Sequence, residues 1–518
     1  MIKVGIIFVY MDYHRKGAHH RGTLQPQIGP LIAGLLPRNI EIDIVNDTWE
    51  DPDWNKDYDL LFISSLHSDF DRARQISHYW RRRGAKTVYG GILASTYPHI
   101  CQPFFDAIVI GDPEGAVMQI YQDFCQGDLK PTYVSSSYDS SKTPVPRFDL
   151  VAKKQILPLS LEASRGCPFS CDFCALTGMG TRYHVRPPEM VIRDIVRGQQ
   201  MIEHLVPWYK RHLVLFSDNN IGGNLAYLKK LCDSLAPLGV RWGSSATFNV
   251  VANLEIVKML SRSGCRFLFV GLESFNPAAI VDMQKFQNVI GKTRLVIEQC
   301  RDHGILIGSG LMISPTVDDC KYMQTIPKHL KECGLHVPNF ICFECPIPGT
   351  PHFHRLASEA TPAFLPNALL RDFTGYTLVT RPKRESLVNF IETYKWLMNT
   401  VYAKSTKIRK FADDLPQFLL KGYWLTALID LKDKTFVAWH PHPDRSYLAG
   451  TDTPPPEATN VPLTENDFAS EEEYCAIMSP LKVTDSFGRV LPQWLASTIV
   501  YEPTVRFKRQ TKRLVMVS

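Results

Sequence analysis

The strongest chemical signal in the chain lies in Leu157–Cys174, which reads Leu-Pro-Leu-Ser-Leu-Glu-Ala-Ser-Arg-Gly-Cys-Pro-Phe-Ser-Cys-Asp-Phe-Cys. Its apolar beginning, Leu157–Leu161, predicts a strand. Cys167, Cys171 and Cys174 follow on a tight loop, separated by three and then two residues. Three cysteine thiolates can hold three irons of a cubane iron–sulfur cluster. An incomplete set of protein ligands leaves the fourth iron open to a substrate or a cofactor.

The alternative for these cysteines is a structural zinc site, which would close its tetrahedron with a fourth ligand such as His184. Gly166 and Pro168 favour a loop at the end of a strand over a compact zinc finger. The sequence therefore predicts a cluster with one open iron.

The spacing and its surroundings resemble the radical S-adenosylmethionine (SAM) superfamily, in which the amino and carboxylate groups of SAM chelate the open iron. In that family an electron from the cluster cleaves a carbon–sulfur bond of SAM and produces a 5′-deoxyadenosyl radical. The resemblance implies a [4Fe–4S] cluster on Cys167, Cys171 and Cys174, with SAM as a cofactor. Phe173 matches the family's aromatic position beside the adenine.

Length and composition describe an ordinary globular protein. The 518 residues predict about three domains at ~150 residues each. Hydrophobic residues make up 45% and charged residues 21%, which argues against wholesale disorder. The formal net charge of +6 is mild, and the basic runs at 81–83 and 506–513 are short, so we expect no nucleic-acid partner.

The chain shows no sign of a membrane segment or a secretory leader. No stretch approaches eighteen uninterrupted apolar residues, and residues 1–10 read as a first strand without a cleavage site. Thirteen cysteines without a signal peptide fit a reducing compartment, where thiols ligate metal or lie in the core. We expect a cytoplasmic protein with no membrane partner.

The first part of the chain, residues 1–135, predicts a Rossmann-like α/β domain. Short apolar runs alternate with helical stretches such as Gln27–Leu36 and Phe70–Arg83, which indicates a doubly wound parallel sheet. Residues 126–156 are polar and rich in Pro and Ser, and we place a linker at 136–156. The predicted strands are Ile2–Tyr10, Ile40–Asn46, Leu60–Ser65, Lys86–Gly90 and Ala107–Ile110.

A second alternating series, residues 157–375, predicts a partial (β/α)6 barrel with its chemistry at the carboxyl ends of the strands. Residues 376–518 read as a mixed α/β region that walls the substrate pocket, with a helix at Glu385–Lys404 and a strand-like run at Thr435–Trp439. The strands of the barrel are predicted from Leu157, then at Leu213–Ser217, Arg241–Thr247, Phe267–Leu272, Leu306–Ile313 and Val337–Phe343.

Several barrel residues match SAM-binding positions of the family. Asp218 and Asn219 follow the second strand, where the usual acidic pair is reduced to one acid. Glu273 and Ser274 follow the fourth strand, with a helix cap or a salt bridge at the barrel mouth as the structural alternative. Arg182 matches a basic segment after the cysteines, where it would neutralise the SAM carboxylate or cap the next helix.

The first domain also resembles the cobalamin-binding fold of corrinoid enzymes. A loop with an Asp-x-His-x-x-Gly pattern follows the first strand, a Ser-x-Leu element ends the third, and a Gly-Gly pair ends the fourth. The turn Gly111–Gly115 matches the cobalamin-associated branch of the family. The residues that the resemblance places at cobalamin are Asp12, His14, Ser64, Leu66, Gly90 and Gly91.

His14 has two readings. It would coordinate cobalt with Asp12 hydrogen-bonded to its far nitrogen. Most radical SAM members with this domain, however, bind cobalamin without a histidine ligand, and some keep the fold without the cofactor. A dinucleotide site is disfavoured, because no Gly-x-Gly-x-x-Gly follows Tyr10.

The resemblance implies an enzyme that methylates an unactivated carbon of a small-molecule or natural-product substrate. One SAM would methylate cob(I)alamin, while a second SAM at the cluster would yield the radical. A flavodoxin- or ferredoxin-type protein would donate the electron. One alternative is a radical SAM enzyme that forms a ring, rearranges its substrate or transfers a 3-amino-3-carboxypropyl group.

Two more candidate functions belong to different classes of protein. A tRNA methylthiotransferase would need a second cysteine triad in the first domain, where only Cys101 and Cys125 occur. A non-catalytic iron–sulfur or zinc sensor would hold the metal without cleaving SAM.

Overall fold

The computed structural model describes most of the chain, in seven segments. Asp12, His14, Arg182 and the strand-like run at 435–439 lie outside them, so the expectations placed on these residues stay predictions. The described residues are 1–10, 26–47, 50–135, 143–180, 183–429, 448–449 and 461–497.

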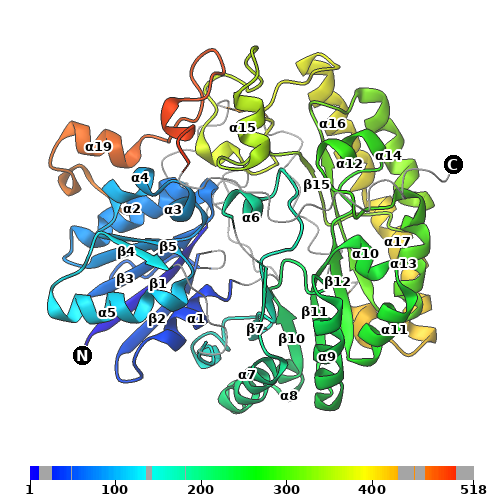
Figure 1. The fold of residues 1–518 in the computed structure, drawn as a ribbon, viewed down its shortest axis with the longest axis horizontal. Helices are drawn as coiled ribbons and strands as arrows, with labels where there is room; N and C mark the ends of the chain where they lie inside the picture. The colour runs from blue at the N-terminus through cyan, green and yellow to red at the C-terminus, as the bar shows by residue number, and fades with distance from the viewer. Residues whose placement is uncertain are drawn as a thin grey trace.

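Two parallel α/β sheets stand side by side, with α6 (Ala175–Gly178) and α15 (Pro351–Ala357) between them (Figure 1). The first sheet has six strands in the order β2-β1-β3-β4-β5-β6, all parallel. The strands are β1 Lys3–Val9, β2 Glu41–Asn46, β3 Leu60–Ser65, β4 Lys86–Gly90, β5 Ala107–Gly111 and β6 Thr132–Ser135. The helices are α1 Ile28–Leu35, α2 Phe70–Arg81, α3 Ile92–Thr96, α4 Pro98–Cys101 and α5 Val117–Gln126.

Alternation along the central strands explains the two covered faces of this sheet. On β3, Leu60 and Phe62 pack in the core that includes α1 and α5, whereas Leu61 and Ile63 pack in the core that includes α2. The predicted Rossmann-like sheet is thereby confirmed. Its order reverses between β1 and β3, and ligands of such sheets bind at the carboxyl ends beside that switch point.

The polar region at 126–156 differs from the prediction. Residues 132–135 form the edge strand β6, which pairs with β5. An edge strand can expose one face, and here Tyr133 is buried while Val134 is 66% exposed, so the stretch carries little apolar signal. Phe148 and Val151 are also buried, and the second half of the predicted linker packs as part of the core.

The second sheet confirms the predicted partial barrel. Five parallel strands run in the order β13-β12-β11-β10-β7, and β14 pairs in parallel with β15. The strands are β7 Leu159–Leu161, β10 Leu213–Phe216, β11 Arg241–Ala246, β12 Cys265–Val270, β13 Leu306–Gly308, β14 Gly310–Ile313 and β15 Phe340–Phe343. The helices are α7 Pro188–Met201, α8 Trp208–Arg211, α9 Leu225–Leu235, α10 Phe248–Val251, α11 Leu254–Arg262, α12 Pro277–Asp282, α13 Thr293–Asp302 and α14 Cys320–Glu332.

The predicted fifth strand is one apolar run in the sequence but two strands in the structure. It breaks at Ser309, whose backbone N–H donates to Asn339 Oδ1 at 2.8 Å and whose hydroxyl donates to the Val270 carbonyl at 2.7 Å. After the break, the Glu273–Leu311 bridge connects the end of the fourth strand to β14. The barrel wall therefore continues from the fourth strand to β14 through the bridge at Glu273, and we call this junction the seam.

The predicted helix at 385–404 is α16 (Leu387–Val401), and it is followed by α17 (Lys404–Leu420).

The last described segment, residues 461–497, packs onto the first domain. Helix α19 (Glu471–Met478) lies beside α2 (Figure 1), and the buried Arg74 donates to the Ala476 carbonyl at 2.8 Å. The Tyr97 hydroxyl donates to the Trp494 carbonyl at 2.9 Å, so this segment bridges to α2 and α4.

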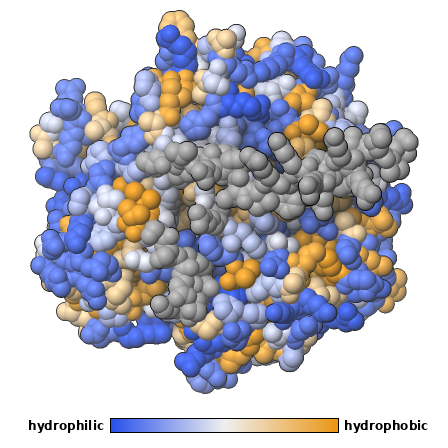
Figure 2. Space-filling view, viewed as in Figure 1, coloured by the Kyte–Doolittle hydropathy of each residue, from blue (hydrophilic) through white to orange (hydrophobic). Residues whose placement is uncertain are grey.

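The surface carries mostly hydrophilic side chains with separate small apolar patches on the face shown in Figure 2. Among the described residues, no helix combines the length and the apolar character needed to cross a bilayer.

Candidate active site

The three cysteines lie on a loop that follows β7 and the short strand β8 (Ser164–Arg165). We call residues 166–180 the cluster loop. At its base, β8 (Ser164–Arg165) pairs antiparallel with β9 (His184–Val185), and we call these two strands the neck. The neck closes the loop at the carboxyl end of the first barrel strand, where the chemistry of such barrels is found.

Asp218 ties the neck to the barrel. This fully buried carboxylate follows β10 and accepts hydrogen bonds from Ala163 N at 2.9 Å and from the backbone N–H and hydroxyl of Ser164 at 2.5 Å. Burial raises the pKa of Asp218 to about 7. Through these hydrogen bonds the Asp218 carboxylate holds the base of the cluster loop in place. The expected contact of Asp218 with SAM stays a prediction.

Each cysteine of the cluster loop has N–H donors beside its sulfur. Asn220 Nδ2 donates to Cys167 Sγ and Gln287 Nε2 donates to Cys171 Sγ, both at 3.7 Å. Burial raises the pKa of Cys174, and backbone hydrogen bonds from the start of α6 oppose that rise. All three thiols are free. N–H donors around thiolate sulfur are what tunes an iron–sulfur cluster, so the residues present fit this group.

A buried cation stands next to these thiols. The ammonium of Lys285 forms an ion pair with the Glu273 carboxylate and lies 5.8 Å from the centre of the Phe173 ring. Burial raises the pKa of Cys171, and the Lys285 charge opposes that rise. The pKa of Lys285 is itself raised, because Glu273 and the thiols outweigh the burial that would lower it. Lys285 thus supplies positive charge where three thiolates would gather.

Glu273 and Ser274 both have structural partners. Glu273 is buried with φ of 64°, forms the salt bridge at the barrel mouth and lies in the seam of the barrel wall. The Ser274 hydroxyl shares a hydrogen bond with Tyr322 Oη at 2.8 Å and accepts one from Asn276 N at 3.0 Å. The salt-bridge alternative is thus present, whereas the cap of α12 is Asn276, and contacts of Glu273 and Ser274 with SAM stay predictions. Asn219, the neighbour of Asp218, is exposed.

Phe173 packs in a small apolar cluster beside the cluster loop. The cluster consists of Ala279 and Met283, at α12 and its end, and Met312 of β14, and Val317 and Cys342 also pack against it. An aromatic ring against two methionines makes a flat, polarizable wall, which suits an adenine ring. The Cys342 thiol donates to the Leu311 carbonyl at 3.6 Å.

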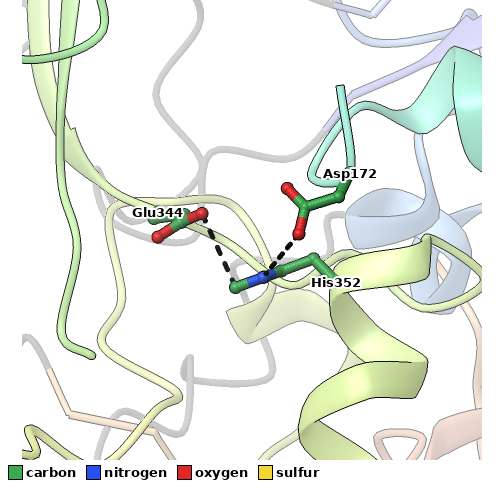
Figure 3. A group of neighbouring side chains, drawn as sticks. All are labelled: Asp172, Glu344 and His352. Atoms are coloured by element: carbon green, nitrogen blue, oxygen red, sulfur yellow. Dashed lines mark ion pairs between the residues drawn. The ribbon is translucent and has the colours of Figure 1, made fainter. Parts of the chain in front are cut away.

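A buried polar cluster joins the cluster loop to the end of the sixth strand (Figure 3). His352 Nδ1 lies 3.5 Å from Asp172 Oδ2, and His352 Nε2 lies 3.8 Å from Glu344 Oε1. Arg355 Nη2 donates to Asp172 Oδ2 at 2.9 Å and lies 2.7 Å from His352 Nδ1. The guanidinium already supplies the positive charge here, so we interpret the cluster as a clamp on the loop. Burial raises the pKa of Glu344 to about 7.

The structure brings the Ser-x-Leu and Gly-Gly elements of the first domain together. Ser64 and Gly90 are partners in the β3–β4 register, at the carboxyl end of the sheet beside the switch point. Gly91 has φ of 132°, and a Cβ there would lie 3.5 Å from Ser64 Oγ and 3.2 Å from the Ser65 carbonyl oxygen. Leu66 is 43% exposed at the same edge. Their contact with cobalamin stays a prediction.

Asn220, Lys285 and Gln287 could not be predicted as site residues from the sequence. Asn220 adjoins the predicted Asp218–Asn219 pair, and only the turn geometry shows which asparagine faces Cys167. Lys285 and Gln287 come from the segment after α12, more than a hundred positions from the cysteines, and no local pattern marks them.

The fold and the site define a class of protein: a partial parallel barrel whose first strand feeds a loop with three free cysteines. Residues 161–326 match the sequence profile of the family described as the radical SAM superfamily. This match confirms, for the barrel part of the chain, the radical SAM assignment made from the cysteine spacing. The radical SAM match implies a [4Fe–4S] cluster and SAM as cofactors.

Two named enzymes are similar to most of the chain. The chain is 24% identical over 402 residues to bacteriochlorophyllide d C-8(2)-methyltransferase of Chlorobaculum tepidum, covering 72% of this chain and 86% of the relative. It is 20% identical over 419 residues to anaerobic magnesium-protoporphyrin IX monomethyl ester cyclase of Rubrivivax gelatinosus, covering 72% of each.

Among solved structures, the chain is similar to the cobalamin-dependent S-adenosylmethionine radical enzyme OxsB with aqua-cobalamin and S-adenosylmethionine bound. The TM-score is 0.57 at 13% sequence identity, and the match covers 89% of this chain and 78% of OxsB. At this identity the likeness shows a shared fold, and it extends across both sheets of the present structure.

Proposed function

We propose that this protein is a cobalamin-dependent radical SAM methyltransferase that acts on a carbon atom of a small-molecule substrate. One observation carries the proposal: the neck of the three-cysteine loop contacts the first domain through Arg165, and the carboxyl edge of the sheet in that domain bears Ser64, Gly90 and Gly91. In this proposal the cysteine loop binds one cofactor and the edge of the first sheet binds the other. The named methyltransferase relative and the OxsB fold support the same reading.

The residues around the cysteines have separate tasks in this proposal. Cys167, Cys171 and Cys174 would hold the cluster, and when bound it supplies the electron that breaks a carbon–sulfur bond of SAM. Asn220 and Gln287 hold two of the sulfurs in place through their amide N–H groups.

Charge and shape beside the loop would orient SAM. The Lys285 ammonium offsets the negative charge of the thiolates. The apolar wall of Phe173 and Met312 excludes water from the reacting region. The predicted SAM-binding residues remain Phe173, Asp218, Asn219, Glu273, Ser274 and Arg182.

At the edge of the first sheet, Ser64 and the glycine pair would let cobalamin approach the backbone, and Leu66 offers an exposed apolar side chain beside them. When bound, cobalamin supplies a carrier for the methyl group. Asp12 and His14 remain predicted partners of the cobalt side. A flavodoxin- or ferredoxin-type donor and a cytoplasmic location complete the proposal.

The test uses full-length protein reconstituted anaerobically with iron and sulfide and supplied with hydroxocobalamin. Corrin absorption bands that stay with the protein beside a cluster shoulder are expected. SAM with a deuterated methyl group is then incubated with candidate substrates, and the product mass is measured. A gain of one labelled methyl group supports the proposal. Reconstituted protein that retains no corrin would refute it.

A second candidate is a radical SAM enzyme that closes a ring without transferring a methyl group, as the named cyclase relative suggests for the family. The same experiment separates the two. A product without the label, formed together with 5′-deoxyadenosine, would favour the cyclase-like reaction.

A further inference from the structure

Arg165 joins the neck of the cluster loop to the first domain. Its guanidinium donates to Asp112 at 2.8 Å, to the two Glu114 oxygens at 3.0 and 2.8 Å, and to Glu162 at 2.7 and 3.0 Å. The Arg165 side chain is 12% exposed and that of Glu114 is 7% exposed. Asp112 and Glu114 belong to the turn after β5, whereas Arg165 lies two residues before Cys167. One side chain therefore connects the two sheets.

The turn that receives this arginine is held rigidly by its own domain. Gly111 has φ of 95° and packs so closely on the Ser135 carbonyl that a Cβ would clash with it. Its N–H donates to Ser95 Oγ at 3.1 Å. A Cβ at Gly115 would likewise collide with the Ser135 hydroxyl. The turn is thus seated against the edge strand β6 and α3, and it offers Asp112 and Glu114 as fixed acceptors.

The other end of the connection is equally fixed. Arg165 pairs with His184 across the neck, and Asp218 holds the adjacent Ser164 to the barrel. A planar guanidinium with N–H groups along three sides can bridge several carboxylates at set angles, which a lysine ammonium cannot do. The side chain acts as a rigid spacer between two supported backbones.

Charge also makes this contact sensitive to change. One guanidinium faces three carboxylates, from Glu162, Asp112 and Glu114. Without the arginine these groups would repel one another in a partly buried interface, and the turn would move away from the neck.

We propose that Arg165 is a positioning residue that sets the spacing between the cluster loop and the carboxyl edge of the first sheet. The proposal rests on the proposed function for its second cofactor, since that edge is where cobalamin is placed. The contact itself is independent of any cofactor. A group that must pass between two cofactors needs a defined gap, and Arg165 is the side chain that spans the two supporting edges.

The experiment compares the parent with Arg165→Lys and Glu114→Gln, each as reconstituted holoprotein. Arg147→Lys is the matched control, because Arg147 is 15% exposed and binds Asp149 two positions away at 2.7 Å, a local pair within one segment. Hydrogen exchange is measured at the amides of residues 114–116 and 164–167. The spin–spin interaction between the reduced cluster and cob(II)alamin is measured by pulsed electron paramagnetic resonance.

We expect about tenfold faster exchange at both segments in the two test variants, with parent-like exchange in the control. We also expect a broader distribution of cluster-to-cobalt distances. Unchanged exchange in Arg165→Lys, or faster exchange with an unchanged distance distribution, would overturn the positioning role. A parent that binds no cobalamin would refute the proposed function, while the exchange data still decide whether Arg165 couples the two segments.

Discussion

Replacing Asp218 with alanine tests how the cluster loop is held. Asp218 accepts three hydrogen bonds at the neck, two of them from the backbone N–H groups of Ala163 and Ser164, and none of these groups reaches solvent. Asp218→Ala leaves both backbone donors buried without an acceptor. Each unsatisfied buried donor costs about 1–3 kcal/mol, so local opening of the neck becomes easier by roughly 3 kcal/mol.

The assay is hydrogen exchange at the amides of Ala163 and Ser164 in the cluster-free protein, combined with iron content after reconstitution. A change of roughly 3 kcal/mol corresponds to roughly 100-fold faster exchange if opening is local. Iron bound per chain should fall as well, because the loop that carries the cysteines loses its support.

The control is Asp319→Ala, which removes one capping hydrogen bond, from Tyr322 N at 2.8 Å, at the start of α14. It should lower stability by about 1 kcal/mol and leave the iron content unchanged. Exchange at Ala163 and Ser164 as slow in Asp218→Ala as in the parent would refute the reasoning.

Further outcomes follow from the same site. Cys171→Ala should lose cluster iron and abolish SAM cleavage, whereas Cys232→Ala, at a buried cysteine outside the cluster loop, should keep both; iron analysis and 5′-deoxyadenosine formation check this. Lys285→Met should lower the reduction potential of the cluster by on the order of 50 mV, with Lys285→Arg close to the parent in a redox titration. Because burial raises the pKa of Asp218 from 3.8 to about 7, the folded state binds extra protons and loses stability as pH rises through that window. Asp218→Asn should remove this component in unfolding experiments at about pH 5 and about pH 8; equal pH dependence in both proteins would contradict the assignment.

The strands of both sheets were predictable because their signal is local. Val4, Ile6 and Ile7 of β1 or Leu60 and Leu61 of β3 form continuous apolar runs that only a strand covered on both faces accommodates. Strand β6 was not predicted, because an edge strand needs few buried side chains and so has a weak apolar pattern. The break at Ser309 could not be predicted, because it depends on Asn339, which lies thirty positions later. The Asn339 side chain accepts the hydrogen bond of the Ser309 backbone N–H.

The cysteines of the site were predictable because their spacing alone indicates an iron–sulfur cluster with one open iron. Their surroundings were not, since Asn220 comes from the loop after β10, whereas Gln287 and Lys285 come from the segment after α12. Arg165 adjoins the cysteine motif, yet its partners Asp112 and Glu114 lie about fifty positions away in another domain. Such contacts depend on how the two sheets are oriented, which no local pattern encodes.

The left-handed backbone of Glu273 has a consequence for how variants at this position are interpreted. Its N–H donates to the Gly310 carbonyl at 3.3 Å and its carbonyl accepts from Met312 N at 2.6 Å, while its side chain pairs with Lys285. One residue thus joins β14 to the end of the fourth strand through its main chain and also pairs with Lys285 through its side chain. Inactivity after replacing it would therefore mix a loosened wall with a lost contact, and Glu273→Gln, which spares the main chain, is the informative exchange.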